Sequence, residues 1–334
     1  MGHRFVKELN DKESVDDIFL VSEKQLRSNR QGNLYLQCEL SDKTGSVGAR
    51  MWNAGEEVAD GFHDGDFVRV QGTTQVYQGA LQLIATKINK VAVNEVAEQD
   101  YRRLTTDQIQ RLTDRLRELL GNVTDPALAA VAESFLADEQ WMDKFTRAPA
   151  GVKNHHAYQG GLLEHVVQLL EIITRIADLY PELDRDLLLL SALLHDSGKV
   201  DELGYERQLS YTSEGQLLGH IVMGVELLDR KLDRLARQGV LVPAETVLRL
   251  KHIIVSHHGS LEFGSPAVPM TVEAVALHYL DNLDAKIHHF ASLLREDANV
   301  DSEWTQYHPN LGRKLYRGSI PNNLSPAQAP HDRR

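Results

Sequence analysis

Histidine and aspartate cluster in one region of this 334-residue chain, where their types and spacing could bind metal ions. Eleven of the fifteen histidines lie between positions 155 and 289, and several have a histidine or aspartate as neighbour. Neutral imidazole and carboxylate are the ligands that hold borderline and hard divalent cations. The pattern predicts a two-metal hydrolase site, with candidate ligands His165, His195, Asp196, His220, His257, His258 and Asp281.

Helices are predicted to carry these side chains, because apolar residues recur with helical spacing through this part of the chain. Thr105 with Gln108 predicts a capping box that opens the first helix, and Gly121 would end it. The His195-Asp196 pair would end a strongly apolar helix, where burying it is costly unless a cation compensates. Further helices are expected over 160–180, 183–195, 215–238, 244–258 and 270–295.

Short alternating apolar runs before this region predict β-strands. Leu34, Leu36, Cys38 and Leu40 alternate with polar residues and are expected to face a core. Five short strands favour a closed barrel of the OB-fold type, and a fragment of a β-sandwich is the alternative. The predicted strands lie at 17–21, 34–40, 46–52, 66–72 and 81–93.

Composition and charge exclude several classes of protein. The net charge of −12 argues against duplex binding through a general basic surface, although a local groove can still be positive. No apolar stretch approaches the ~20 residues of a membrane span, and no secretory signal is evident at the N-terminus. The single cysteine, Cys38, excludes an internal disulfide. A cytoplasmic protein with no membrane partner is expected.

The order of the motifs resembles that of a known enzyme family. His…His-Asp…Asp is the order of the HD superfamily of metal-dependent phosphohydrolases, and the adjoining blocks resemble those of the YhaM-type 3′→5′ exoribonucleases. These blocks are NHHAYQGGLLEHV (154–166), HDSGK (195–199), GHIVMG (219–224), SHHGSLEFGSP (256–266) and ALHYLDNLDAK (276–286). The family also carries an OB-fold before its HD domain.

The resemblance implies a multidomain α and β protein, with an N-terminal five-stranded OB-type barrel followed by an all-α HD domain. The implied divisions are an OB-fold nucleic-acid-binding domain at 1–97, a helical linker at 98–145, the HD domain at 146–317 and a disordered tail at 318–334.

The resemblance also implies how two cations would be held. His165, His195 and Asp281 would hold one, and Asp196 would bridge it to a second, held by His220, His257 and His258. Besides Asp196, the catalytic residue implied is Lys199, which would neutralise the phosphate as negative charge builds. Manganese is expected, with iron or magnesium as alternatives. The residues expected to orient ligands or contact substrate are His155, His156 and Asp284.

Three residues of the barrel could bind nucleic acid. Tyr35, Arg50 and Trp52 are predicted to share one strand face, where bases could stack on the aromatic rings. Ordinary packing of these aromatic side chains against the linker helix is the alternative interpretation. The resemblance, rather than these residues, favours RNA.

The function expected is a metal-dependent 3′→5′ exoribonuclease that hydrolyses single-stranded RNA to mononucleotides, with single-stranded DNA as a second substrate and a homo-oligomer as a candidate assembly. One alternative is an HD phosphohydrolase of small nucleotides whose barrel is a regulatory module. Another is a single-strand-binding protein without activity. The intact ligand set argues against the second alternative, and the barrel argues against the first.

Overall fold

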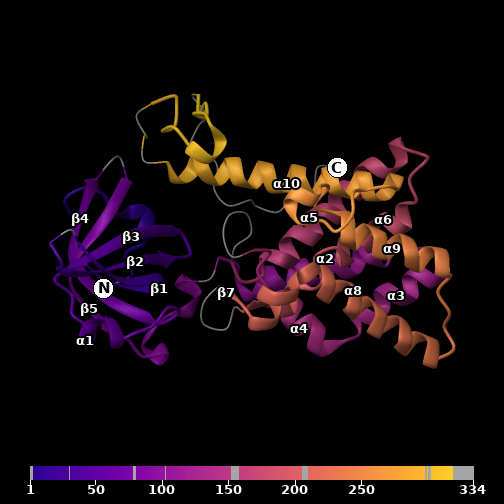
Figure 1. The fold of residues 1–334 in the computed structure, drawn as a ribbon, viewed down its shortest axis with the longest axis horizontal. Coiled ribbons are helices and arrows are strands. Elements are labelled where there is room, and N and C mark those ends of the chain that lie inside the picture. Colours follow the sequence, from indigo (N-terminus) through magenta and orange to yellow (C-terminus); the bar gives the residue numbers. More distant parts are fainter. Residues whose placement is uncertain are drawn as a thin grey trace. The chain divides into compact units, whose positions relative to one another are not determined.

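The computed structural model describes residues 3–318 apart from 30, 78–79, 102, 152–157, 205–209, 298 and 300–301. The chain forms two compact units, which are Met1–Tyr101 with His289–Arg334, and Arg102–His288 (Figure 1). His155 and His156, which were predicted to support the site, lie outside the described residues, as does the predicted tail beyond Gly318.

The N-terminal unit contains a closed five-stranded barrel with the strand order β1-β2-β3-β5-β4. All its neighbouring strands pair antiparallel except β3 and β5, which are parallel. This closed order confirms the predicted OB-type barrel and excludes the sandwich alternative. The elements are β1 (Ser14–Ser28), β2 (Leu34–Asp42), β3 (Gly45–Trp52), α1 (Glu56–Asp60), β4 (Phe67–Tyr77) and β5 (Ala80–Lys90).

Alternation along the strands separates a buried interior from an exterior, because successive side chains of a strand point to opposite faces. Leu36, Cys38 and Leu40 of β2 are buried as predicted. Leu34 was predicted to join them but is exposed, since it stands at the first position of the strand. Tyr35 therefore belongs to the outer face, where it pairs in register with Trp52 of β3.

The second unit consists mainly of helices. The predicted capping box is confirmed: Gln108 N donates to Thr105 Oγ1 at the start of α2, and the helix ends at Gly121. The helices are α2 (Thr106–Leu120), α3 (Pro126–Leu136), α4 (Glu139–Arg147), α5 (Gly161–Ile176), α6 (Arg185–Leu194), α7 (Lys199–Glu202), α8 (Ser213–Arg237), α9 (Ala244–Ser256) and α10 (Val272–Glu296). Of α10, the residues up to His288 belong to this unit and the rest to the first. A short hairpin of β6 (Leu203–Gly204) and β7 (Ser210–Tyr211) follows α7.

Helix α6 is the centre of the helical core. Every residue from Leu187 to Leu194 is buried, as a helix that is apolar on all sides requires. Helices α2, α3 and α4 cover most of the predicted linker 98–145, and they contribute Leu116, Phe135 and Phe145 to this same core. Within the described part of the chain, no helix is long and apolar enough to cross a membrane.

Candidate metal centre

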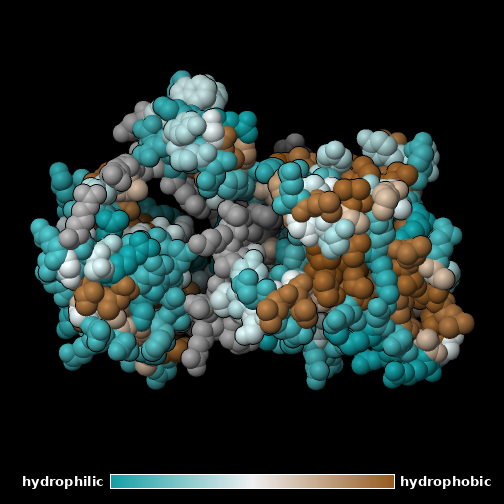
Figure 2. All heavy atoms as spheres, viewed as in Figure 1, coloured by the Kyte–Doolittle hydropathy of each residue, from teal (hydrophilic) through white to brown (hydrophobic). Residues whose placement is uncertain are grey.

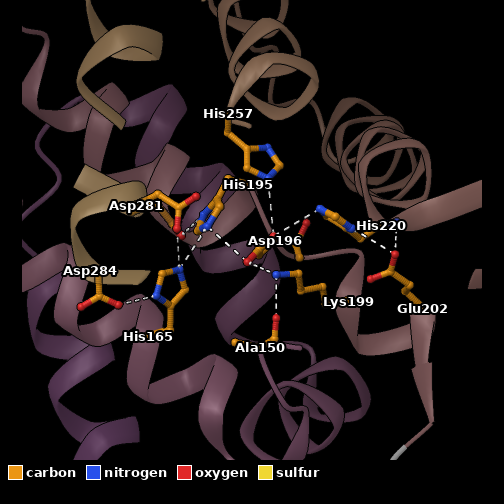
Figure 3. Close-up of polar contacts among 12 residues, drawn as sticks. Ala150, His165, His195, Asp196, Lys199, Glu202, His220, His257, Asp281 and Asp284 are labelled. Carbon is orange, nitrogen blue, oxygen red and sulfur yellow. Dashed lines mark hydrogen bonds and ion pairs between the residues drawn. The ribbon is translucent and has the colours of Figure 1, made fainter. Parts of the chain in front are cut away.

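Five helices of the second unit bring the candidate ligands to one place (Figure 3). Each ligand lies within a helix or one to two residues after its end, so that the rigid helices fix the positions of the side chains. The ligands are His165 in α5, His195 and Asp196 after α6, His220 in α8, His257 and His258 after α9, and Asp281 in α10.

The first group of ligand atoms lies between α5, α6 and α10. His165 Nε2 lies 3.4 Å from His195 Nε2 and 3.3 Å from Asp281 Oδ1. Asp196 Oδ2 lies 3.4 Å from His195 Nε2. Two nitrogens that both lie ~2.1 Å from one cation are separated by roughly this distance. Four side chains can therefore share one cation here.

The second group lies between α8 and α9. Ligand atoms of His220, His257 and His258 all lie within 4.8 Å of one another. Asp196 Oδ1 is 3.5 Å from His220 Nε2 and 3.6 Å from His257 Nε2. Each carboxylate oxygen of Asp196 thus faces a different histidine group, which is the arrangement of a ligand that joins two cations.

The five histidines share one further feature, because in each the Nδ1 atom is held by an oxygen acceptor. An Nδ1–H bond to oxygen places the proton on that nitrogen and leaves the Nε2 lone pair available for a metal. The Nδ1 atoms of His165, His195, His220, His257 and His258 lie 2.8, 2.9, 3.1, 2.8 and 2.9 Å, respectively, from Asp284 Oδ2, Ala192 O, Glu202 Oε1, Ile254 O and Phe263 O.

Three described atoms at the centre fit a divalent cation because they are buried and make no hydrogen bond. Among the described residues, Asp196 Oδ1, His220 Nε2 and His257 Nε2 are buried without a hydrogen bond. A polar atom buried in this way costs free energy unless something compensates it. Bound cations would compensate all three, so that the residues present fit a metal centre.

Asp196 and Asp281, the two carboxylates that face the histidines of the centre, are ionised. Burial opposes ionisation of Asp196, but Lys199 and His195 outweigh burial and hold the pKa of Asp196 well below its usual range. Burial also opposes ionisation of Asp281, whereas its hydrogen bond with His165 and the nearby His195 lower the pKa of Asp281. The centre therefore presents negative charge that a cation can neutralise.

The histidines differ between the two groups. Burial lowers the pKa of His165, but contacts with Asp281 and Asp284 outweigh burial and raise the pKa to about 10. Without a cation this ring therefore carries a proton on each nitrogen at neutral pH, and a cation that binds Nε2 would displace the proton there. Burial lowers the pKa of His257, and burial together with the neighbouring His257 lowers that of His258 to about 4. His257 and His258 are therefore neutral at neutral pH, which is the form that binds metal.

Lys199 lies beside the bridging carboxylate. Its Nζ atom donates to Asp196 Oδ2 at 2.7 Å and to Ala150 O at 2.7 Å. The side chain of Lys199 is largely buried, and its ammonium group forms an ion pair with Asp196. Its contribution to the centre is a positive charge beside the oxygen that His195 also faces.

Glu202 is a supporting residue that the sequence analysis missed. Its Oε1 atom accepts from both the backbone N and the Nδ1 of His220, at 3.0 and 3.1 Å. Gly219 allows this contact by breaking α8 with a φ of 74°, a left-handed conformation that favours glycine. The sequence feature that could have indicated Glu202 is its position, three residues after Lys199 and close to the His195-Asp196 pair.

On the barrel, the three predicted nucleic-acid-binding residues share the outer surface. The rings of Tyr35 and Trp52 lie 5.2 Å apart, and Trp52 is 46% exposed. The Arg50 guanidinium lies 6.0 Å from the ring centroid of Tyr77 at the end of β4. Tyr77 is also exposed, and the sequence analysis missed it because the strand face could not be assigned beyond β3.

Comparison with known proteins finds relatives of both units. Residues 162–286, which include all seven candidate ligands, match the HD domain, and residues 20–91 match the OB-fold nucleic acid binding domain. The chain is 37% identical over 278 residues to the 3′-5′ exoribonuclease YhaM of Bacillus velezensis, a match that covers 82% of this chain and 86% of that protein.

Two solved structures are also similar in part. One is the second OB-fold domain of replication protein A from Methanococcus maripaludis, at 24% identity over 27% of this chain and 95% of that chain, with a TM-score of 0.22. The other is asparaginyl-tRNA synthetase from Pyrococcus horikoshii, at 13% identity over 72% and 62% of the two chains, with a TM-score of 0.24. TM-scores this low support no further inference.

Proposed function

The chain belongs to the family of the 3′-5′ exoribonuclease YhaM, and from this premise we infer that it is a metal-dependent 3′→5′ exoribonuclease. We propose that it hydrolyses the phosphodiester bonds of single-stranded RNA and releases mononucleotides. The observation that carries the proposal is Asp196, whose two carboxylate oxygens face two separate groups of histidines.

The proposed centre holds two divalent cations. His165, His195 and Asp281 would hold one, and the second would be held by His220, His257 and His258, with Asp196 shared between them. Imidazole and carboxylate ligands suit manganese, which we propose as the metal, ahead of iron or magnesium. Two bound cations lower the pKa of water and stabilise the charge of a phosphoryl group under attack.

The protein's own residues position this chemistry. Asp284 and Glu202 keep the proton of His165 and His220 on Nδ1, so that Nε2 of each faces the centre. Lys199 orients Asp196 through its 2.7 Å contact and adds positive charge near the phosphate that is cleaved. In this role Lys199 acts on the carboxylate as well as on the substrate.

The barrel would hold the RNA strand. Exposed aromatic rings stack on bases without regard to sequence, and a neighbouring guanidinium attracts the phosphates. Tyr35, Trp52 and Arg50, joined by Tyr77, supply both functions on one surface. The first unit would then bind the RNA strand, and the second unit would hydrolyse it.

Purified protein incubated with manganese and end-labelled single-stranded RNA tests the proposal. We expect stepwise loss of nucleotides from the RNA and little hydrolysis of free small nucleotides. The same assay with single-stranded DNA determines whether the 2′-hydroxyl is required. Rapid hydrolysis of small nucleotides with intact RNA would instead support a nucleotide phosphohydrolase.

A further inference from the structure

The segment that follows α10 forms a small ordered hairpin, residues 302–318, which we call the C-terminal hairpin. Isolated bridges pair Trp304 with Tyr316 and His308 with Arg313. Thr305 N donates to Leu315 O at 2.9 Å, and both of these residues are buried. The hairpin therefore has an inner side, on which Thr305 and Leu315 are buried, and an outer side that is exposed.

The hairpin is anchored by polar contacts that do not involve its outer side. The Arg317 guanidinium donates to Asn299 O at 3.1 Å and to Leu294 O at 3.2 Å. Asp297 Oδ2 accepts from Gln306 N at 2.9 Å. Substitution of outward-facing residues should accordingly leave the hairpin folded.

Large aromatic side chains occupy the outer side. Trp304, Tyr307 and Tyr316 are 48%, 56% and 58% exposed, and the rings of Trp304 and Tyr316 lie 5.0 Å apart. Aromatic residues make up 6% of the chain, yet they supply three of these seventeen positions. Exposed rings held by a rigid element can contact a ligand with little loss of conformational entropy.

The charge of the hairpin is opposite to that of the chain. Its basic residues are Arg313, Lys314 and Arg317, and its acidic residue is Glu303, in a chain of net charge −12. Arg313 and Lys314 are exposed. Because Lys314 stands two residues before Tyr316 in an extended segment, we expect the two side chains to point to the same side.

The chemistry of this surface favours nucleic acid over protein. The aliphatic residues Leu311 and Leu315 are partly or fully buried, so that the large apolar groups exposed on the hairpin are all aromatic. Figure 2 shows brown, hydrophobic surface on the helical unit, whereas the segment after α10 is mostly white to teal. Aromatic rings interspersed with cations match alternating bases and phosphates.

We propose that the C-terminal hairpin is a second binding surface for single-stranded RNA, separate from the outer face of the barrel. Bases would stack on Trp304 and Tyr316, while Lys314 would contact phosphates. Arg313 instead lies over the ring of Phe290, 5.4 Å from its centroid. The inference rests on the proposed function, because it takes the RNA substrate of the enzyme as its ligand.

Tryptophan fluorescence tests the contact directly in the full-length protein. The chain has three tryptophans, of which Trp141 is only 5% exposed, so that Trp52→Phe leaves Trp304 as the exposed one. Oligo(U) with phosphorothioate linkages, which resist hydrolysis, should quench the emission of this variant. Quenching should saturate at the concentration at which fluorescence anisotropy of labelled oligo(U) reports binding.

Binding measurements on hairpin variants provide the second test. Trp304→Ala should weaken oligo(U) binding about 5- to 150-fold, the range that follows from losing one base–aromatic stack. Lys314→Ala should reduce the slope of log affinity against log salt by about 0.7, as expected for one phosphate contact with a single strand. Tyr180→Ala and Arg237→Ala, at exposed positions of the helical unit, are the matched controls and should retain full affinity.

The outcomes separate this inference from the proposed function. If the wild type degrades RNA but Trp304 emission is unchanged at saturating oligo(U), the hairpin inference is wrong and the proposed function stands. If the wild type neither binds nor degrades RNA, both are wrong. A Trp304→Ala variant with full RNA affinity but a changed sedimentation coefficient would show that the hairpin joins copies of the chain, which also overturns the inference.

Discussion

Asp284 Oδ2 lies 2.8 Å from His165 Nδ1, while the Nε2 atom of the same ring lies 3.3 Å from Asp281 Oδ1. The imidazole of His165 is therefore held between two carboxylates, one on each nitrogen. Asp284 is nearly fully buried and also contacts His288 Nδ1 at 3.2 Å. Such an outer carboxylate orients the ring of a metal ligand and raises its basicity.

Asp284→Asn should weaken manganese binding about 10- to 100-fold, because the amide retains the shape of the side chain but loses the charge that supports His165. Titration of activity with manganese should show the shift, with activity recovered at high manganese. Asp229→Asn, which removes a surface ion pair with Lys251, is the control. An unchanged manganese dependence would argue against this role for Asp284.

Asp196→Ala and Asp196→Asn should both abolish RNA hydrolysis, because the proposed shared ligand of the two cations is lost. The alanine variant should also be less stable, since it leaves Lys199 buried without its carboxylate partner. Chelation should abolish turnover by the wild type, and metal analysis should find fewer bound cations in both variants. A folded Asp196→Asn variant that retains turnover would contradict the assignment of the centre.

Hydrolysis should proceed from a free 3′ end. A strand labelled at its 5′ end should give a descending ladder of products in a gel assay, with mononucleotides as the released species. A strand whose 3′ end is blocked should resist degradation, and one blocked at its 5′ end serves as the control. Equal degradation of both blocked strands would indicate internal cleavage.

Tyr35→Ala and Trp52→Ala should each weaken binding of long RNA by roughly 1–3 kcal/mol, the contribution of one base–aromatic stack. The loss should be smaller for a dinucleotide, which has only two bases to stack. A truncated chain that begins near Leu104 should likewise lose more affinity for long RNA than for a dinucleotide. Comparable cleavage of long RNA by the truncated and full-length proteins would exclude the barrel as the RNA-holding module.

Asp186→Asn should destabilise the protein by about 1–2 kcal/mol at neutral pH, because Asp186 Oδ2 accepts hydrogen bonds from Thr124 N, Thr124 Oγ1 and Asp125 N. Burial raises the pKa of Asp186, but these hydrogen bonds outweigh burial and lower the pKa below its ordinary value of 3.8.

A depressed pKa in the folded state means that the stabilisation by Asp186 is present above pH ~4 and is lost as pH falls through the folded pKa. The difference between wild type and Asp186→Asn should therefore shrink in acid. Urea unfolding followed by far-UV circular dichroism measures this difference in the free energy of unfolding. Asp178→Asn, at an exposed position, is the control. A difference that grows below pH ~4 would contradict this explanation.

Much of the fold follows from local rules that act within a few residues. The capping box of Thr105 and Gln108 and the alternation along β2 predict elements that the structure confirms. The candidate ligands could be named for a similar reason, because the chemistry of imidazole and carboxylate depends on residue type. The prediction that Leu34 is buried was wrong, because alternation does not indicate where a strand leaves the core.

Only the tertiary structure decided which groups meet. Asp281 stands more than a hundred positions from His165 in the sequence, yet packing of α10 against α5 sets their oxygen and nitrogen 3.3 Å apart. Glu202 became a partner of His220 through a break in α8 at Gly219. The inclusion of α2, α3 and α4 in the core of the helical unit likewise depends on packing. Residue types and local spacing determine which side chains can bind a cation and which segments can form a helix. Long-range packing determines which of these side chains share a site. Contacts between distant segments form only when the buried surfaces of whole helices fit together.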